Sequence, residues 1–132
     1  MASIFTKIVN GEIPSYKIAE TATCFAFLDI NPLAKGHTLV IPKQETDNLF
    51  DLDDKLYSEL CLLAKKVAKA IEKTIPCAKV GLAVVGLEVR HAHIHLIPIN
   101  GVHDIDFKRP KLKFSTEEFT NIAAAIIANV QH

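Results

Sequence analysis

The stretch that decides the fold is KVGLAVVGLEVRHAHIHLIPI, residues 79–99. Lys79–Val85 and His93–Ile99 are rich in apolar and β-branched residues, and we expect a strand in each. Gly86 lies between them and indicates a turn. The stretch therefore predicts two neighbouring strands, and the second carries three histidines in five residues.

Upstream residues predict three more strands. They are Tyr16–Ile18, Cys24–Asp29 and His37–Ile41, with Asn-Pro and Lys-Gly pairs in the loop before the last of them. Side chains alternate across a strand, so Phe25 and Phe27 share one face, and their neighbours face the other way. Each strand is short and close in sequence to the next.

Two long helices stand apart from these strands. Asp51–Asp54 can cap the first helix, which Pro76 ends, and its apolar stripe is Leu56, Leu60, Leu63, Val67, Ala70 and Ile71. Ser115–Glu118 forms a capping box for the last helix, whose predicted apolar face is Phe119, Ile122, Ala123, Ile126, Ile127 and Val130. Ser3 can cap a shorter N-terminal helical turn. Strands in neighbouring runs with helices set apart are typical of an α+β fold with an antiparallel sheet, although a parallel crossover around the long helix is an alternative.

Composition limits the classes of partner. The 132 residues fit one domain, and 15 basic and 15 acidic side chains cancel. We therefore expect no nucleic acid and no membrane among the partners, because no net field attracts either. No signal peptide or membrane span is apparent, and the three cysteines (Cys24, Cys61 and Cys77) form no CxxC pair. These features predict a cytoplasmic protein with reduced thiols.

Three of the six histidines, His91, His93 and His95, alternate along the predicted strand. On an extended strand their rings would share one face, while the residues between them enter the core. Two chemistries use such a cluster. One is metal binding, with Glu88 and His37 as further ligands. The other is nucleophilic attack on phosphorus by a neutral imidazole whose second nitrogen is held as a proton donor.

The histidines belong to a longer pattern that resembles a known family. His91-Ala-His-Ile-His-Leu-Ile97 matches the motif that names the histidine triad (HIT) family, in its HinT-like branch. The segments Phe25–Pro32, with Asp-Ile-Asn-Pro, and Gly36–Lys43, with Gly-His-Thr-Leu-Val-Ile-Pro-Lys, resemble its nucleotide-binding strand, loop and strand. The similarity covers about Ile4 to Ile99.

The resemblance implies a fold and an assembly. The fold would be HIT-like, with an antiparallel five-stranded sheet, one long central helix and a C-terminal helix. Residues 1–132 would form a single HIT-like domain, in which 100–132 is a tail that carries the last helix. The family forms homodimers through sheet edges, which suits the 49% hydrophobic content of this chain. No cofactor and no metal would be required.

The resemblance also implies roles for individual residues. His93 would attack the α-phosphorus and form a nucleotidyl-histidine intermediate, and the backbone carbonyl of His91 would orient its ring. His95 and His37 would flank the phosphate. Asp29 would accept the ribose hydroxyls, although a turn residue before Asn-Pro is an alternative interpretation. The base would lie in an apolar slot formed by Phe5, Ile8, Phe27 and Ile30.

The chain departs from the family just before the triad. Many members carry an Asn, a Gly-rich loop and then Gly-Gln-Ser or Gly-Gln-Thr, whereas this chain has Leu87 and Glu88 in place of the amide and the hydroxyl. An ionised carboxylate there would repel a phosphate. We expect Glu88 to pair with a nearby cation, Arg90 or Lys43. The alternatives are a salt bridge to a protonated triad histidine and a catalytic acid in the leaving-group region.

Three functional hypotheses follow. The first is a HIT-type hydrolase or nucleotidyl transferase that acts on small nucleotides, either adenosine phosphoramidates or dinucleoside polyphosphates. The second is a metal-dependent enzyme that uses the HxHxH cluster, although amidohydrolase barrels need about twice this length and cupin barrels lack a long amphipathic helix. The third is a nucleotide-binding module with little turnover.

Overall fold

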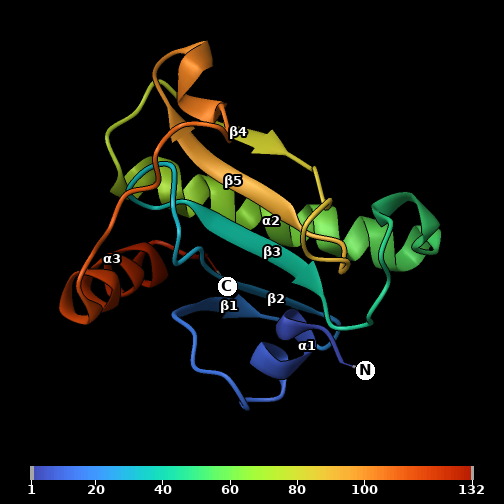
Figure 1. Cartoon of the computed structure of the whole chain (residues 1–132). Helices are drawn as coiled ribbons and strands as arrows, with labels where there is room; N and C mark the ends of the chain where they lie inside the picture. The colour runs from blue at the N-terminus through green and yellow to red at the C-terminus, as the bar shows by residue number, and fades with distance from the viewer. Residues whose placement is uncertain (1, 132) are drawn as a thin grey trace.

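A five-stranded antiparallel sheet organises the molecule (Figure 1). The computed structural model describes residues 2–131, so Met1 and His132 lie outside the described residues. The strand order is β1-β2-β3-β5-β4, with every neighbouring pair antiparallel. The strands are β1 (Lys17–Glu20), β2 (Cys24–Leu28), β3 (Thr38–Pro42), β4 (Lys79–Ala83) and β5 (Ile94–Ile99). The predicted α+β class with five strands is confirmed.

The long helix α2 (Asp54–Thr74) connects β3 to β4. Both strands pair antiparallel with β5, which lies between them, so β3 and β4 run in the same direction. The alternative of a parallel crossover around the long helix is therefore correct for the directions of β3 and β4, but these two strands are not neighbours in the sheet. Because β5 separates the two strands, no parallel pair forms among residues 2–131.

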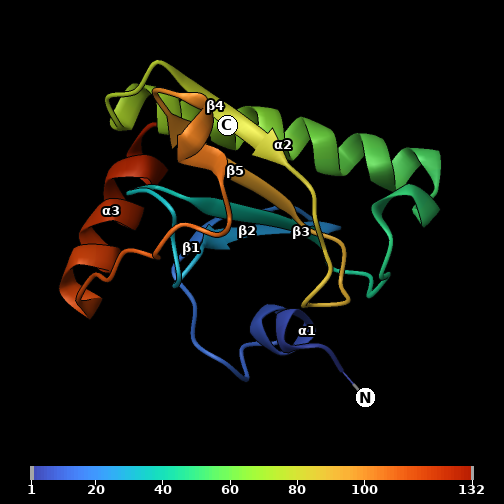
Figure 2. The same ribbon diagram turned by 45° about the horizontal axis from the view of Figure 1, so that its top comes forward.

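Helices cover both faces of the sheet (Figure 2). α2 and α3 (Thr116–Ala128) pack on one face, where their apolar stripes join one side of β2, β3 and β5 in the larger core. The short helix α1 (Ile4–Val9) lies on the other face and forms a smaller core whose members are Phe5, Phe25, Phe27, Leu39 and Ile41. The alternation predicted for β2 thus separates the two cores, with Phe25 and Phe27 on the α1 side.

The predicted caps position these helices. Ser3 accepts from the Thr6 backbone N–H at the start of α1, and Asp53 does the same for Leu56 in α2. Ser115 and Glu118 form the reciprocal capping box of α3. Two 3-10 helices, η1 (Leu49–Asp51) and η2 (Val102–Ile105), complete the elements. Each of the three α-helices begins where a short polar side chain accepts a hydrogen bond from a backbone N–H that has no acceptor within the helix.

Some boundaries and faces differ from the prediction. β4 ends at Ala83 and β5 begins at Ile94, so residues 84–93 form a longer irregular connection than a turn at Gly86. β1 is shifted toward Glu20. Ile127 was expected on the buried face of α3 but is 43% exposed, because the helix contacts its neighbours through a narrower stripe. Within residues 2–131, no helix has both the length and the apolar character needed to cross a membrane.

Candidate active site

A cavity of about 460 Å³ opens on the α1 face of the sheet. Its walls come from α1, the end of β2, the connection 85–89, the start of β5 and the segment around Phe107. Eight of the residues singled out in the sequence line it: Phe5, Ile8, Phe27, Asp29, Ile30, Glu88, His93 and His95. Residues distant in the chain therefore meet in one place, as a ligand site requires.

His93 has a defined tautomer. Its Nδ1 lies 2.7 Å from the backbone oxygen of His91, and a carbonyl oxygen only accepts, so Nδ1 carries the proton. Burial lowers the pKa of His93, an effect that the His91 carbonyl partly opposes. At neutral pH the ring is therefore uncharged, and Nε2 keeps a free lone pair. This is the protonation state that a nucleophilic imidazole needs.

His95 has the opposite tautomer because of a chain of hydrogen bonds. The backbone N–H of Leu33 donates to His37 Nδ1 at 3.0 Å, so His37 carries its proton on Nε2. That Nε2 lies 3.0 Å from His95 Nδ1 and donates to it. His95 Nδ1 is therefore an acceptor, and its proton is on Nε2. One main-chain N–H thus makes His95 a hydrogen-bond donor beside the nucleophile.

Burial keeps both of these rings neutral. It lowers the pKa of His37 to about 3, with a further contribution from His95, and that of His95 to about 4, with a further contribution from His93. His37 is 1% exposed and does not line the cavity. The expectation that His37 flanks the phosphate directly is therefore wrong in position: it lies behind His95 and contacts the site through that ring.

His91 lies outside the cavity that His93 and His95 line. Only His95 lies within β5, and the His91 ring is fully buried away from the cavity. Its Nε2 donates to Pro42 O at 2.8 Å, so its Nδ1 accepts from Ser3 Oγ at 2.7 Å. All three rings nevertheless lie on the α1 side of the sheet, as predicted: Phe5 contacts the rings of His91 and His93, and the ring of His93 contacts that of His95. The residues between them, Ala92 and Ile94, do enter the larger core as predicted.

Asp29 is a turn residue at the cavity wall. Its Oδ1 accepts from the Asn31 backbone N–H at 2.9 Å, which is the turn contact, and its Oδ2 lies 3.5 Å from His37 Nε2. It also lines the cavity. Burial raises the pKa of Asp29, and the hydrogen bond from Asn31 opposes this. The turn therefore orients the carboxylate and leaves it acceptor capacity toward the cavity.

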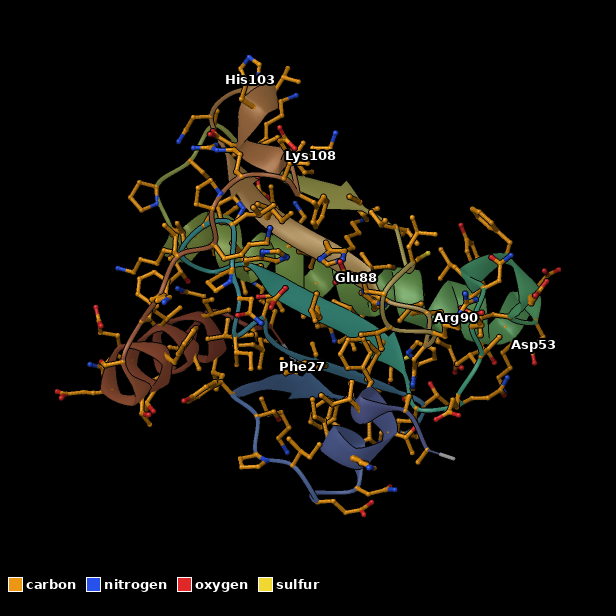
Figure 3. All side chains as sticks on the ribbon, in the orientation of Figure 1. Phe27, Asp53, Glu88, Arg90, His103 and Lys108 are labelled. Atoms are coloured by element: carbon orange, nitrogen blue, oxygen red, sulfur yellow. The ribbon has the colours of Figure 1, made fainter. Side chains whose placement is uncertain are left out.

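Glu88 is not paired as expected. Arg90 forms its salt bridge with Asp47 at 3.2 Å, and Lys43 forms one with Glu20 at 2.7 Å. Among the ion pairs of residues 2–131 there is none with Glu88, which is exposed at the cavity wall. The predicted pairing with Arg90 or Lys43 is therefore wrong, because both cations have closer carboxylates. Figure 3 labels Glu88 and Arg90, which lie at separate places along this connection.

The HxHxH cluster does not form a metal site as such. In the described part of the chain, one group could hold an ion: Asp29, His37 and His95, whose ligand atoms lie within 4.8 Å of one another. Both nitrogens of His37 are already used, one as acceptor from Leu33 and one as donor to His95. A neutral imidazole ligates through an unprotonated nitrogen, so binding would break this chain. The hydrogen-bonded donor set fits a metal poorly.

Sequence reasoning missed several residues at the site. The ring of Phe107 contacts that of His95 with centroids 4.7 Å apart, and Lys111 lines the cavity. Ser3 was predicted only as a cap, and Glu45 was not predicted at all, yet Glu45 Oε1 accepts from Ser3 N and from Thr6 Oγ1. The run Lys108–Lys113, which contains four cations, was the one sequence signal that could have indicated Phe107 and Lys111. His103, which was given no role, lies on η2 at the edge of the molecule (Figure 3).

Comparison with known proteins gives the family. The sequence model of the HIT domain matches residues 10–102, more than half of the chain. The chain belongs to the HIT family. The resemblance seen in the sequence is therefore confirmed, and the matched residues include the buried triad.

Relatives in the HIT family match nearly the whole chain. The adenosine 5'-monophosphoramidase hnt1 of Schizosaccharomyces pombe is 37% identical over 99% of this chain and 100% of its own length. A Hit-like protein involved in cell-cycle regulation from Bartonella henselae has a TM-score of 0.83 at 32% identity, covering 96% and 95% of the two chains. A zinc-bound histidine triad family protein from Mycobacterium smegmatis has a TM-score of 0.81 at 27% identity, covering 97% and 94%. The two solved structures share the fold of this chain.

Proposed function

We propose that this chain is a nucleotide hydrolase of the HIT type that cleaves the phosphoramidate bond of adenosine 5'-phosphoramidates. The observation that carries the proposal is the tautomer of His93, with Nδ1 held by the His91 carbonyl at 2.7 Å and Nε2 free at the cavity. The relative from Schizosaccharomyces pombe, named an adenosine 5'-monophosphoramidase, supports this substrate class. Dinucleoside polyphosphates are the second substrate class of the proposal.

The reaction proceeds in two displacements. His93 Nε2 attacks the α-phosphorus, a P–N bond forms to the ring, and the bond to the leaving amine breaks. The leaving nitrogen takes a proton that solvent supplies, while the His91 carbonyl stabilises the charge on the phosphorylated ring through Nδ1–H. Water then attacks the same phosphorus and releases the nucleoside monophosphate, returning one proton to solvent. An acceptor other than water would make the same step a nucleotidyl transfer.

Other residues bind and orient the substrate. His95 donates through Nε2–H to a phosphate oxygen, a role that its tautomer supports. Asp29 accepts the ribose hydroxyls through its remaining lone pairs. Phe5, Ile8, Phe27 and Ile30 form the base slot. Ile30 is 62% exposed, and a base stacked there would cover it.

We expect the protein to release AMP from adenosine 5'-phosphoramidate, and we expect EDTA to leave that rate unchanged. Neither attack by imidazole nor binding of a monophosphate ester needs a Lewis acid, and His37 has no free ligand atom. Chromatography of the products with and without chelator gives the measurement. Activity that is lost with EDTA and restored by zinc would support the metal-dependent enzyme instead. Nucleotide binding without AMP release would leave only a binding module.

We also propose a homodimer in which the β4 edges of two copies join. Leu82 is 59% exposed on this edge strand, and Val84 and Val85 beside it are 39% and 48% exposed. A charge on an edge strand opposes such pairing. Sedimentation should therefore give a dimer for the natural chain and a monomer for Leu82→Lys. Phe50→Lys, which alters an apolar residue of η1 that is 77% exposed, is the matched control and should remain dimeric.

A further inference from the structure

Glu88 brings an unpaired carboxylate into the cavity. It is exposed, it lines the same cavity as His93 and His95, and among residues 2–131 no ion pair engages it. Arg90 and Lys43, the two cations expected to pair with it, form salt bridges with Asp47 and Glu20 instead. Its charge is therefore directed at whatever occupies the cavity.

The rest of the cavity does not neutralise this charge. The lining contains two carboxylates, Asp29 and Glu88, and one ammonium, Lys111. His93 and His95 are neutral, since burial lowers the pKa of both. The Lys111 ammonium donates to two carbonyls of its own segment, Phe107 O at 2.5 Å and Arg109 O at 3.2 Å. The lining thus carries one more carboxylate than ammonium, and two of the three Lys111 N–H groups are used within its own segment.

The leaving group must occupy the part of the cavity that the base, ribose and phosphate do not fill. On the proposed function, the base lies in the slot of Phe5 and Ile30, and Asp29 binds the ribose. An in-line displacement sends the leaving group away from His93 Nε2, and Glu88 is the charged wall residue not already engaged.

We propose that Glu88 is a specificity-determining residue that selects nucleoside 5'-phosphoramidates whose leaving amine carries a second, cationic group. The carboxylate attracts that cation as the P–N bond breaks, and it repels leaving groups that bear a carboxylate or further phosphates. The inference rests on the proposed function and narrows its substrate class. It disfavours dinucleoside polyphosphates, whose leaving group is strongly anionic.

The test uses three adenosine 5'-phosphoramidates of equal chain length, made from diaminobutane, aminobutanol and aminobutyrate. A unit charge ~6 Å from Glu88 changes the rate by a factor between about 3 and about 100 for effective dielectrics of ~80 and ~20. We therefore expect kcat/KM to differ about tenfold per unit charge, or about 100-fold between the cationic and the anionic tail. In Glu88→Gln this ratio should fall to about one, and 1 M salt should reduce it in the natural chain.

Two matched variants make the result specific. Glu72→Gln removes an exposed carboxylate from α2, on the opposite face of the sheet, and should keep the full ratio. Glu88→Ser should behave like Glu88→Gln, because both lack the charge. An unchanged ratio in both Glu88 variants would overturn the proposal. So would a natural chain that does not distinguish the cationic from the anionic tail.

Binding separates this inference from the proposed function. His93→Ala cannot form the intermediate, so calorimetry with that protein measures the Kd of the same three compounds without turnover. In His93→Ala, the compound with the cationic tail should bind more tightly than the other two, and adding Glu88→Gln should remove this difference. That result would support the role of Glu88 even if the natural chain releases no AMP. Equal Kd values for the three tails, together with AMP release by the natural chain, would refute the selection by Glu88 and keep the hydrolase.

Discussion

Replacing His93 with Ala should lower the turnover of adenosine 5'-phosphoramidate by on the order of a thousandfold or more, because the attacking atom is removed. The nucleotide should still bind, with a Kd within about threefold of the natural value. The proposed base slot, Asp29 and His95 all remain in place, and on the proposed mechanism the ring of His93 acts only in bond making. This contrast between lost turnover and retained binding is the signature of a nucleophile.

Quenched-flow assays and calorimetry measure the two quantities on one protein. Mass spectrometry after an acid-free quench should find a nucleotide adduct on His93 in the natural chain and none in the variant. His103→Ala is the matched control, since His103 is an exposed histidine on η2, and it should keep full activity. Near-normal AMP release by His93→Ala, with an unchanged melting temperature, would remove the covalent mechanism.

Periodicity predicted most of the fold. The stripe of α2 and the alternation in β2 each follow from a repeat that burial enforces, and both are found as expected. Polar caps such as Ser115 and Glu118 fixed the helix starts. The strand order was beyond reach of the sequence, because β5 enters between β3 and β4 through contacts that no local pattern specifies.

The candidate site was predictable in membership but not in arrangement. The family pattern indicated the histidines and Asp29, yet the ring directions depend on partners far along the chain. His91 turns toward Pro42 and Ser3, and the proton position on His95 depends on the Leu33 N–H through His37. The error over Glu88 has the same origin, since Asp47 and Glu20 compete for the cations that its sequence neighbourhood offers.

The buried pair His37 and His95 should make the fold sensitive to acid. Their folded pKa values of about 3 and about 4 lie below the ordinary 6.5 because burial penalises the charged ring, which is 1% exposed in His37 and 8% in His95. Below pH 6.5 these two rings are therefore protonated in the unfolded chain but remain neutral in the folded chain. The free energy of unfolding consequently falls as pH falls through this range. Above pH 6.5 these groups do not affect it. Each ring contributes a slope of up to about 1.4 kcal/mol per pH unit, which gives a loss of about 2–4 kcal/mol between pH 7 and pH 5.

Urea unfolding at a series of pH values measures this slope directly. His95→Gln removes one of the buried rings with a lowered pKa and should reduce the slope, whatever it does to stability at pH 7. His103→Gln removes an exposed ring and should leave the slope unchanged. A slope that is the same in all three proteins would mean that the buried rings accept protons in the fold. In that case the hydrogen-bond chain from Leu33 would not hold them neutral, and His95 would carry a charge beside the nucleophile at mildly acidic pH.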